Sequence, residues 1–254
     1  MSTANMPSGD GKSKSKGKGK DGTAGNGKGS GENGTILINF VLDKSGSMDV
    51  IRDATISGFN EFKNDQARES GDAFFTLTLF DTRFHTVCEA VSVREVPDLD
   101  LASYVPDGMT ALYDAIGHTM RITDDFVAEH QPDQVLFVVM TDGEENSSRE
   151  FDRSRIFQLI EDHRTLAQYE FVYLGANQDS YAVGSGMGVA HGHTLDYDAS
   201  SADTAAKMKQ LSHNVRGHRR HGMPQSAEWF SPALEADGVL EPEEWERKKR
   251  EEGR

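Results

Sequence analysis

The sequence is poor in the features that mark secreted, disulfide-bonded and membrane proteins. One cysteine, Cys88, occurs among 254 residues, so no disulfide can form within the chain. No stretch approaches the ~18 uninterrupted apolar residues of a membrane-spanning helix, and the first residues lack the apolar segment of a signal peptide. These absences argue against a disulfide scaffold and a membrane protein, and a cytoplasmic location is the simplest expectation.

Positive charge is also scarce outside the N-terminal region. The chain has 27 Lys and Arg against 42 Asp and Glu, a net charge of −15. Residues 1–33 hold six lysines and three acidic residues, a charge of +3, so the remainder carries −18. A body this acidic disfavours nucleic acid and favours cations or basic partners.

Residues 1–33 form a separate Gly/Lys/Ser-rich region without a single aromatic residue. Such a stretch buries too little apolar surface to offset the entropy lost on ordering, so we expect a disordered, solubilising tail. A contact of its lysines with nucleic acid or an anionic surface is the alternative.

From Gly34 onward, strand and helix patterns alternate. The alternation predicts an α/β fold with a doubly wound, mostly parallel central sheet, helices on both faces and one antiparallel edge strand. Strands are expected at Ile36–Leu42, Phe74–Phe80, Thr86–Val93, Val135–Met140, Phe171–Leu174 and Thr194–Tyr197. Apolar stripes at helical spacing begin at Ile51, Leu112, Ile156 and Thr204, and a short helix is expected near Asp179–Gly186.

The first of these strands runs directly into an Asp-x-Ser-x-Ser loop. In an open α/β sheet, the loop after such a strand lies at the carboxyl edge, where ligands bind. Asp43, Ser45 and Ser47 offer one carboxylate and two hydroxyls, which are hard oxygen donors of the kind that Mg²⁺, Mn²⁺ and Ca²⁺ accept. Ordinary turn chemistry is the alternative, with Ser47 capping the helix that begins near Asp49.

Two later stretches add donors of the same kind. Thr110 lies in a glycine-bearing loop before a helical pattern, and Asp142 follows the apolar run at Val135–Met140. Each has an ordinary reading as well, Thr110 as a helix N-cap and Asp142-Gly143 as a turn. All three sets of donors at loop or strand ends of one parallel sheet favour a shared site.

These motifs resemble the von Willebrand factor type A (VWA) family with its metal-ion-dependent adhesion site. The resemblance covers roughly Gly34 to Arg220 and also includes the segments Thr-Ala-Leu-Tyr-Asp-Ala and Thr-Asp-Gly-Glu-Glu-Asn. It implies a Rossmann-like VWA domain over residues 34–220, similar to stand-alone bacterial and phage-like members. It also implies a complete set of metal ligands: Asp43, Ser45, Ser47, Thr110 and Asp142.

The resemblance implies a protein-binding module rather than an enzyme. Hydroxyls from Ser45, Ser47 and Thr110 would hold Mg²⁺ (or Mn²⁺ or Ca²⁺) directly, and the two aspartates would act through bound waters. In the family, a partner protein completes the coordination with Glu or Asp. A metal-dependent hydrolase or phosphotransferase, and a structural subunit with an idle metal site, are the alternatives.

Other candidate sites have weaker patterns. The histidines between His191 and His221 match no zinc spacing and have no companion cysteine. Asp81 ends the second strand at the same sheet edge, where a turn role is expected. In the extension at residues 221–254, which ends in a charged run, Trp229 and Phe230 are expected to pack back on the domain.

Overall fold

A six-stranded sheet with strand order β3-β2-β1-β4-β5-β6 organises this protein. The structure is a computed structural model, and it describes residues 34–176, 179–190, 192–221 and 229–230. All neighbouring strands are parallel except β2 and β3, which pair antiparallel at one edge. The predicted fold class, a mostly parallel α/β sheet with one antiparallel edge strand, is confirmed. The strands are β1 (Ile36–Asp43), β2 (Ala73–Phe80), β3 (Phe84–Ser92), β4 (Gln134–Thr141), β5 (Glu170–Ala176) and β6 (Thr194–Tyr197).

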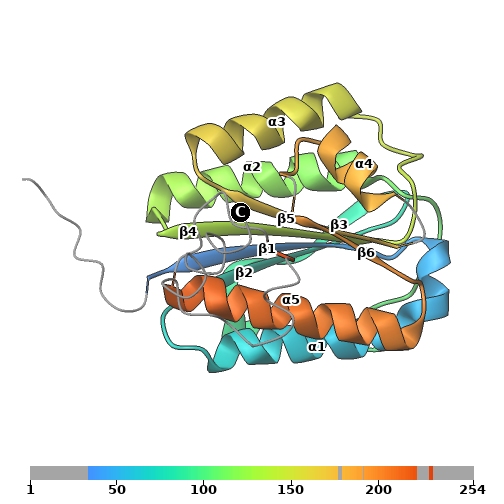
Figure 1. Ribbon diagram of the computed structural model, residues 1–254, viewed down its shortest axis with the longest axis horizontal. Helices are drawn as coiled ribbons and strands as arrows, with labels where there is room; N and C mark the ends of the chain where they lie inside the picture. The colour runs from blue at the N-terminus through green and yellow to red at the C-terminus, as the bar shows by residue number, and fades with distance from the viewer. Residues whose placement is uncertain (1–33, 177–178, 191, 222–228, 231–254) are drawn as a thin grey trace, which may run out of the picture. The chain divides into compact units, whose positions relative to one another are not determined.

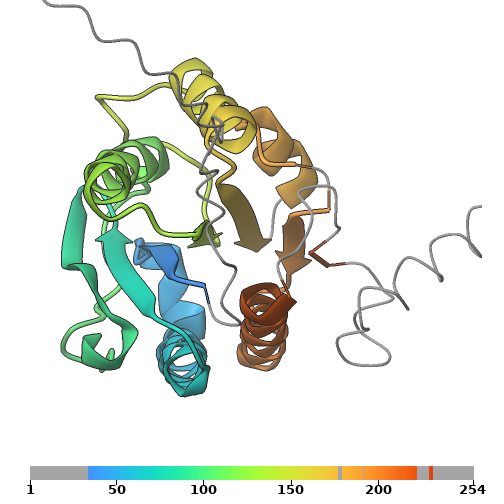
Figure 2. The ribbon, with the colours of Figure 1, turned by 90° about the vertical axis from the view of Figure 1, so that its left-hand side faces the viewer.

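Helices cover both faces of the sheet (Figures 1 and 2). Helices α1 and α5 lie side by side on one face, and α2, α3 and α4 lie on the other. Their bounds are α1 (Arg52–Arg68), α2 (Leu112–His130), α3 (Arg153–Leu166), α4 (Ser180–Gly186) and α5 (Ser201–His221), and two short 3₁₀ helices, η1 (Gly46–Ile51) and η2 (Val93–Glu95), complete the elements. In the part of the chain that the structure describes, no helix combines the length and apolar character needed to span a bilayer.

Burial on both faces explains why β1 is a continuous apolar run rather than an alternating one. One side of the strand contributes to the core beneath α1 and α5, where Phe40 meets Phe59, Phe62 and Phe75 at ring-centroid distances of 5.4–6.4 Å. The other side, with Leu37 and Val41, packs beneath α2. The two cores hold the carboxyl end of β1 from both faces.

Two buried threonines connect α2 to the sheet. Thr119 Oγ1 lies 2.8 Å from Thr78 Oγ1 of β2, and Thr123 Oγ1 donates to Asn39 Oδ1 of β1 at 2.9 Å. Each threonine hydroxyl also contacts a carbonyl one turn earlier in the helix. Because these polar groups are satisfied inside the core, they fix α2 against the sheet at little cost in desolvation.

Trp229 packs back on the domain, as predicted from the sequence. Its side chain is 1% exposed, and its ring lies 5.0 Å from that of His218 and 6.2 Å from that of His193. Its carbonyl accepts a hydrogen bond from Asn214 Nδ2 at 2.5 Å, and the adjacent Phe230 N donates to Gly192 O at 3.3 Å. The described part of the C-terminal extension therefore contributes to the core.

Candidate functional site

The candidate site lies where the connections of two adjacent parallel strands leave in opposite directions. β1 ends at Asp43 and β4 ends at Thr141, and the two strands pair up to Leu42 and Met140. The chain then continues to α1 on one face and to α3 on the other (Figure 1). This point at the carboxyl edge of the sheet is the usual ligand position in open α/β sheets.

Three hydroxyls from two loops converge at this edge of the sheet, around Gly143. Ser45 Oγ and Ser47 Oγ are 3.3 Å apart. A β-carbon placed on Gly143 would lie 3.0 Å from Thr110 Oγ1, 3.6 Å from Ser47 Oγ and 3.7 Å from Ser45 Oγ. One point beside Gly143 is therefore within 3.7 Å of all three hydroxyl oxygens, and the absence of a side chain there leaves that space open.

Both predicted aspartates border the same hydroxyls. Asp43 Oδ1 accepts a hydrogen bond from Ser45 N at 2.6 Å, and Asp43 Oδ2 accepts one from Thr141 Oγ1 at 2.5 Å. Asp142 Oδ1 accepts one from Ser47 Oγ at 2.6 Å. The structure thus brings all five predicted residues together, although Thr110 is 67 positions from Asp43 along the chain.

Burial raises the pKa of both carboxyl groups at the site. For Asp43 the pKa rises to about 6, because desolvation outweighs the hydrogen bonds from Thr141 and Ser45, and the nearby Asp142 adds a smaller increase. Desolvation likewise raises the pKa of Asp142, against the lowering effect of Ser47. Lys44, the nearest lysine in the chain, pairs with Asp81 instead. The aspartates therefore lie in an environment that favours a cation.

The structure contradicts the two helix-capping roles that the sequence allowed for Ser47 and Thr110. Ser47 lies inside η1, and its hydroxyl donates to Asp142 rather than capping a helix, so the predicted capping role is wrong. The N-cap residue of α2 is Ala111, and no side chain caps that helix end. Thr110 is therefore not the N-cap, and its hydroxyl lies with the two serine hydroxyls around the β-carbon position of Gly143.

The backbone around Thr110 is held by the loop after β4. Thr110 N donates to Asn146 Oδ1 at 2.8 Å, and Thr110 O accepts from Asn146 N at 3.0 Å and from Ser147 N at 3.2 Å. Gly46 N also donates to Gly108 O at 3.2 Å, which ties the Thr110 loop to the serine loop. The three loops thus support one another around the hydroxyls.

Sequence reasoning missed the side chains that position these loops. Thr141 orients the Asp43 carboxylate, and Tyr104 Oη donates to the Asp43 carbonyl at 2.5 Å. Glu145 accepts hydrogen bonds from Tyr113 N, Ser147 N and Ser148 N at 2.8–3.0 Å. Glu145 and Thr141 lie within the Thr-Asp-Gly-Glu-Glu-Asn segment around Asp142, which could have identified them as site residues. No sequence pattern distinguishes Tyr104.

The remaining candidates from the sequence have structural roles. Asp81 Oδ1 accepts from Arg83 N at 2.8 Å, which confirms the expected turn role, and its other oxygen pairs with Lys44. His193 and His218 are buried against Trp229, while His191 lies outside the described residues. Among the residues that the structure describes, no group of three or more His, Cys, Asp or Glu side chains is arranged to hold a metal ion.

The donors at the candidate site nevertheless suit a hard divalent cation. They comprise three hydroxyl oxygens around one open point and two carboxylates that border it. Oxygen-only donors of this kind fit Mg²⁺, Mn²⁺ or Ca²⁺ better than a soft ion.

The arrangement of sheet and helices is that of the von Willebrand factor type A fold. A von Willebrand factor type A protein from Catenulispora acidiphila superposes with a TM-score of 0.52 at 14% identity, covering 72% of this chain and 43% of that one. The vWF domain of the type V pili tip protein Mfa5 from Porphyromonas gingivalis gives 0.53 at 10% identity, covering 76% of this chain and 98% of that one.

A third similar structure is proximal thread matrix protein 1 from the mussel byssus with a zinc-occupied MIDAS motif. Its TM-score is 0.50 at 16% identity, over 71% of this chain and 45% of that one. This chain therefore spans less than half of the mussel and Catenulispora proteins. No protein-family model and no curated protein matches the sequence. Similarity at this level of identity shows the fold.

Proposed function

We propose that this protein is a metal-dependent protein-binding module that docks a partner's Glu or Asp at a Mg²⁺-type ion. The observation that carries the proposal is the convergence of the Thr110, Ser45 and Ser47 hydroxyls on one open point. The likeness to a mussel protein described with a zinc-occupied MIDAS motif supports a divalent cation at this place.

The five residues have distinct roles in this proposal. Ser45, Ser47 and Thr110 are the direct ligands, because their neutral oxygens surround the open point. Asp43 and Asp142 orient the serines through hydrogen bonds and supply negative charge. An ion held mainly by hydroxyls and water keeps a strong affinity for one further carboxylate. A partner's acidic side chain would supply that carboxylate.

Exposed apolar side chains in the loops that carry the site residues support a protein as the partner. Val50 is 75% exposed, and Val105 and Met109 are each 49% exposed. Val50 follows Ser47 by three residues, and Met109 immediately precedes Thr110. Apolar side chains beside a polar site are typical of protein contact surfaces, because their burial contributes affinity while the polar group sets orientation.

No observation supports the alternative function, a metal-dependent hydrolase or phosphotransferase. A hydrolase or phosphotransferase needs a general base or nucleophile beside the ion. The carboxylates of Asp43 and Asp142 already accept hydrogen bonds from Thr141, Ser45 and Ser47, which supports a holding role for them. A non-enzymatic role and a cytoplasmic location both remain part of the proposal, the latter resting on the single cysteine.

Calorimetric titration with Mg²⁺ and Mn²⁺ tests the ion site. We expect one ion per chain for the wild type, at least a tenfold loss of affinity in Thr110→Ala, and no detectable binding in Asp43→Ser. Thr165→Ala is the matched control, because Thr165 lies on α3 and its hydroxyl bonds only to carbonyls of its own helix. Undiminished binding in Thr110→Ala would contradict the assignment of its hydroxyl as a ligand.

A further inference from the structure

The segment between η2 and the Thr110 loop lies along helix α1 without forming a helix or strand of its own. We call this segment, residues 96–104, the strap. The side chains of Val96, Leu99 and Tyr104 are 0–3% exposed and belong to the core beneath α1 and α5. Because an irregular backbone cannot satisfy all of its own polar groups, the strap depends on partners outside it.

Polar side chains of α1 bind the backbone of the strap at defined positions. Lys63 Nζ donates to Val96 O at 3.0 Å. Asn60 makes two hydrogen bonds with Leu99, since its Nδ2 donates to Leu99 O and its Oδ1 accepts from Leu99 N, both at 2.8 Å. A carboxamide that binds both backbone groups of one residue fixes the register of the strap, because a shift by one residue breaks both bonds.

Arg52 continues this row of contacts at the first residue of α1. Its Nε donates to Tyr104 O at 3.0 Å, and its Nη2 donates to Leu101 O. The Tyr104 hydroxyl donates in turn to the Asp43 carbonyl at 2.5 Å. A continuous series of hydrogen bonds therefore leads from α1 through the strap to an aspartate of the ion site.

The chain just beyond the strap holds the serine loop at a second place. Asp107 N donates to Lys44 O at 2.9 Å, and Lys44 lies between Asp43 and Ser45. Tyr104 and Asp107 thus bind two consecutive carbonyls, those of Asp43 and Lys44. The position of the strap is therefore transmitted to the backbone immediately before the first serine of the site.

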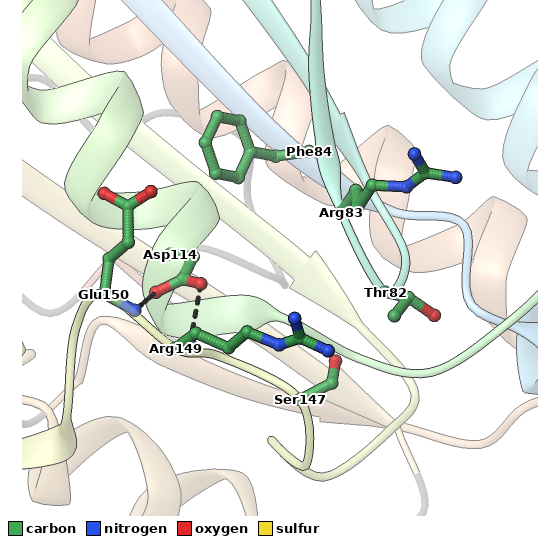
Figure 3. A pocket seen from close by; sticks show the side chains of 7 residues that line it. All are labelled: Thr82, Arg83, Phe84, Asp114, Ser147, Arg149 and Glu150. Carbon is green, nitrogen blue, oxygen red and sulfur yellow. Dashed lines mark hydrogen bonds between the residues drawn. The ribbon is translucent and has the colours of Figure 1, made fainter.

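The Thr110 side of the site has a support that does not involve the strap. Thr110 N donates to Asn146 Oδ1 at 2.8 Å in the loop after β4. Asp114 of α2 accepts from the amides of Arg149 and Glu150 in the same loop, at 2.8 and 2.9 Å (Figure 3). Helix α2 therefore holds the loop that supports Thr110, whereas the strap holds the Asp43 side.

We propose that Asn60 and Arg52 are positioning residues of the ion site, which set the register of the strap on α1 and so hold Tyr104 against the Asp43 carbonyl. The proposal rests on the proposed function, because its effect is on affinity for the ion. Neither residue is a ligand, and both act through the strap. A shift of the strap by one residue would move Tyr104 by about 3.5 Å, which is more than a hydrogen bond tolerates.

Asn60→Ala tests the proposal, with Asn64→Ala as the matched control. Both residues lie on α1 and both exchanges replace the same side chain within the helix, but the Asn64 side chain is exposed. Calorimetric titration should show Mg²⁺ affinity about fivefold lower in Asn60→Ala than in the wild type, and unchanged in Asn64→Ala. Arg52→Lys should give a similar loss, because lysine keeps the charge but lacks the planar fork that reaches two carbonyls.

A double-mutant cycle with Tyr104→Phe separates positioning of the site from general support of the fold. Urea denaturation in EDTA measures the stability of each variant without the ion. If Asn60 acts through the strap, Asn60→Ala should lower Mg²⁺ affinity by less than about twofold once the Tyr104 hydroxyl is absent. A residue that only stabilises the fold would lower the urea midpoint and leave Mg²⁺ affinity unchanged. If Asn60→Ala does not fold, Arg52→Lys carries the same cycle.

The outcomes for this proposal differ from those for the proposed function. A wild type that binds Mg²⁺, together with equal affinities in Asn60→Ala and Asn64→Ala, would overturn the positioning role and leave the proposed function standing. The same conclusion follows if the full loss persists in the Tyr104→Phe background. If the wild type binds no divalent ion, the proposed function fails, and the positioning role fails with it.

Discussion

Replacing Thr141 by Val tests the support of Asp43 without changing side-chain shape. Thr141 is fully buried, and its hydroxyl donates to Asp43 Oδ2 at 2.5 Å while accepting from Gly143 N at 3.1 Å. Valine removes both hydrogen bonds and leaves the carboxylate in the same buried position. We therefore expect a loss of both stability and ion affinity.

The magnitude follows from the two lost contacts. A hydrogen bond to a charged, buried group contributes about 1.5–3 kcal/mol, and a neutral one about 0.5–1.5 kcal/mol. The free energy of unfolding of Thr141→Val should therefore fall by about 2–4.5 kcal/mol in chelator. Removing a hydrogen-bond partner that orients a metal site typically lowers ion affinity by about 10- to 100-fold, and we expect a loss in that range for Mg²⁺.

Urea denaturation in EDTA and calorimetric Mg²⁺ titration measure the two effects. Thr141→Ser is the control, since it keeps the hydroxyl and loses one buried methyl group, at a cost of about 1 kcal/mol. If Thr141→Val matches Thr141→Ser in stability and in Mg²⁺ affinity, the hydroxyl does not orient Asp43 and the account of the site is wrong.

Three further predictions concern the open point, a buried carboxyl and the tail. Gly143→Ala should lower Mg²⁺ affinity with little change in melting temperature, because its methyl group would lie 3.0 Å from Thr110 Oγ1; unchanged affinity would mean the space beside Gly143 is not used. Burial raises the pKa of Glu170 from 4.5 to about 7, against hydrogen bonding by Trp229 and the charge of Arg164. The unfolded chain therefore loses this proton at a lower pH than the folded chain, so the stability of the wild type falls as pH rises between these values. Relative to the wild type, the free energy of unfolding of Glu170→Gln, measured in urea, should rise by about 3 kcal/mol from pH 4.5 to 8. A difference between the two proteins that does not change with pH would refute the shift. Deleting residues 1–30 should leave melting temperature and Mg²⁺ affinity unchanged, whereas a drop of several degrees would show that the tail contributes to the fold.

The fold could be predicted because its strands are buried on both faces. β1, β4 and β5 are nearly continuous apolar runs, and the helices between them carry apolar stripes that pack on the sheet. The antiparallel pairing of β3 was expected from its place beside β2 along the chain, and the structure has it. Local patterns suffice for elements of this kind because each pattern directly reflects which faces are buried.

The supporting contacts of the site could not be predicted, because they join loops far apart in the sequence. Tyr104 and Asp43 are 61 residues apart, and Ser47 and Asp142 are 95 apart. Ser47 looked like a helix cap on local grounds, but the fold brings an aspartate to its hydroxyl, and that tertiary contact replaces the cap. Loop residues lack a periodic pattern, so only the motif residues themselves could be identified from the sequence.

Water-proton relaxation of the Mn²⁺-loaded protein tests the central claim most directly. If the ion keeps a coordination position for a partner carboxylate, adding a glycine peptide that carries a single Glu should displace exchangeable water and lower the relaxation enhancement. The decrease should saturate with the peptide's dissociation constant and be absent for the matching Gln peptide. An enhancement that does not change as the Glu peptide binds would contradict docking of a carboxylate at the ion.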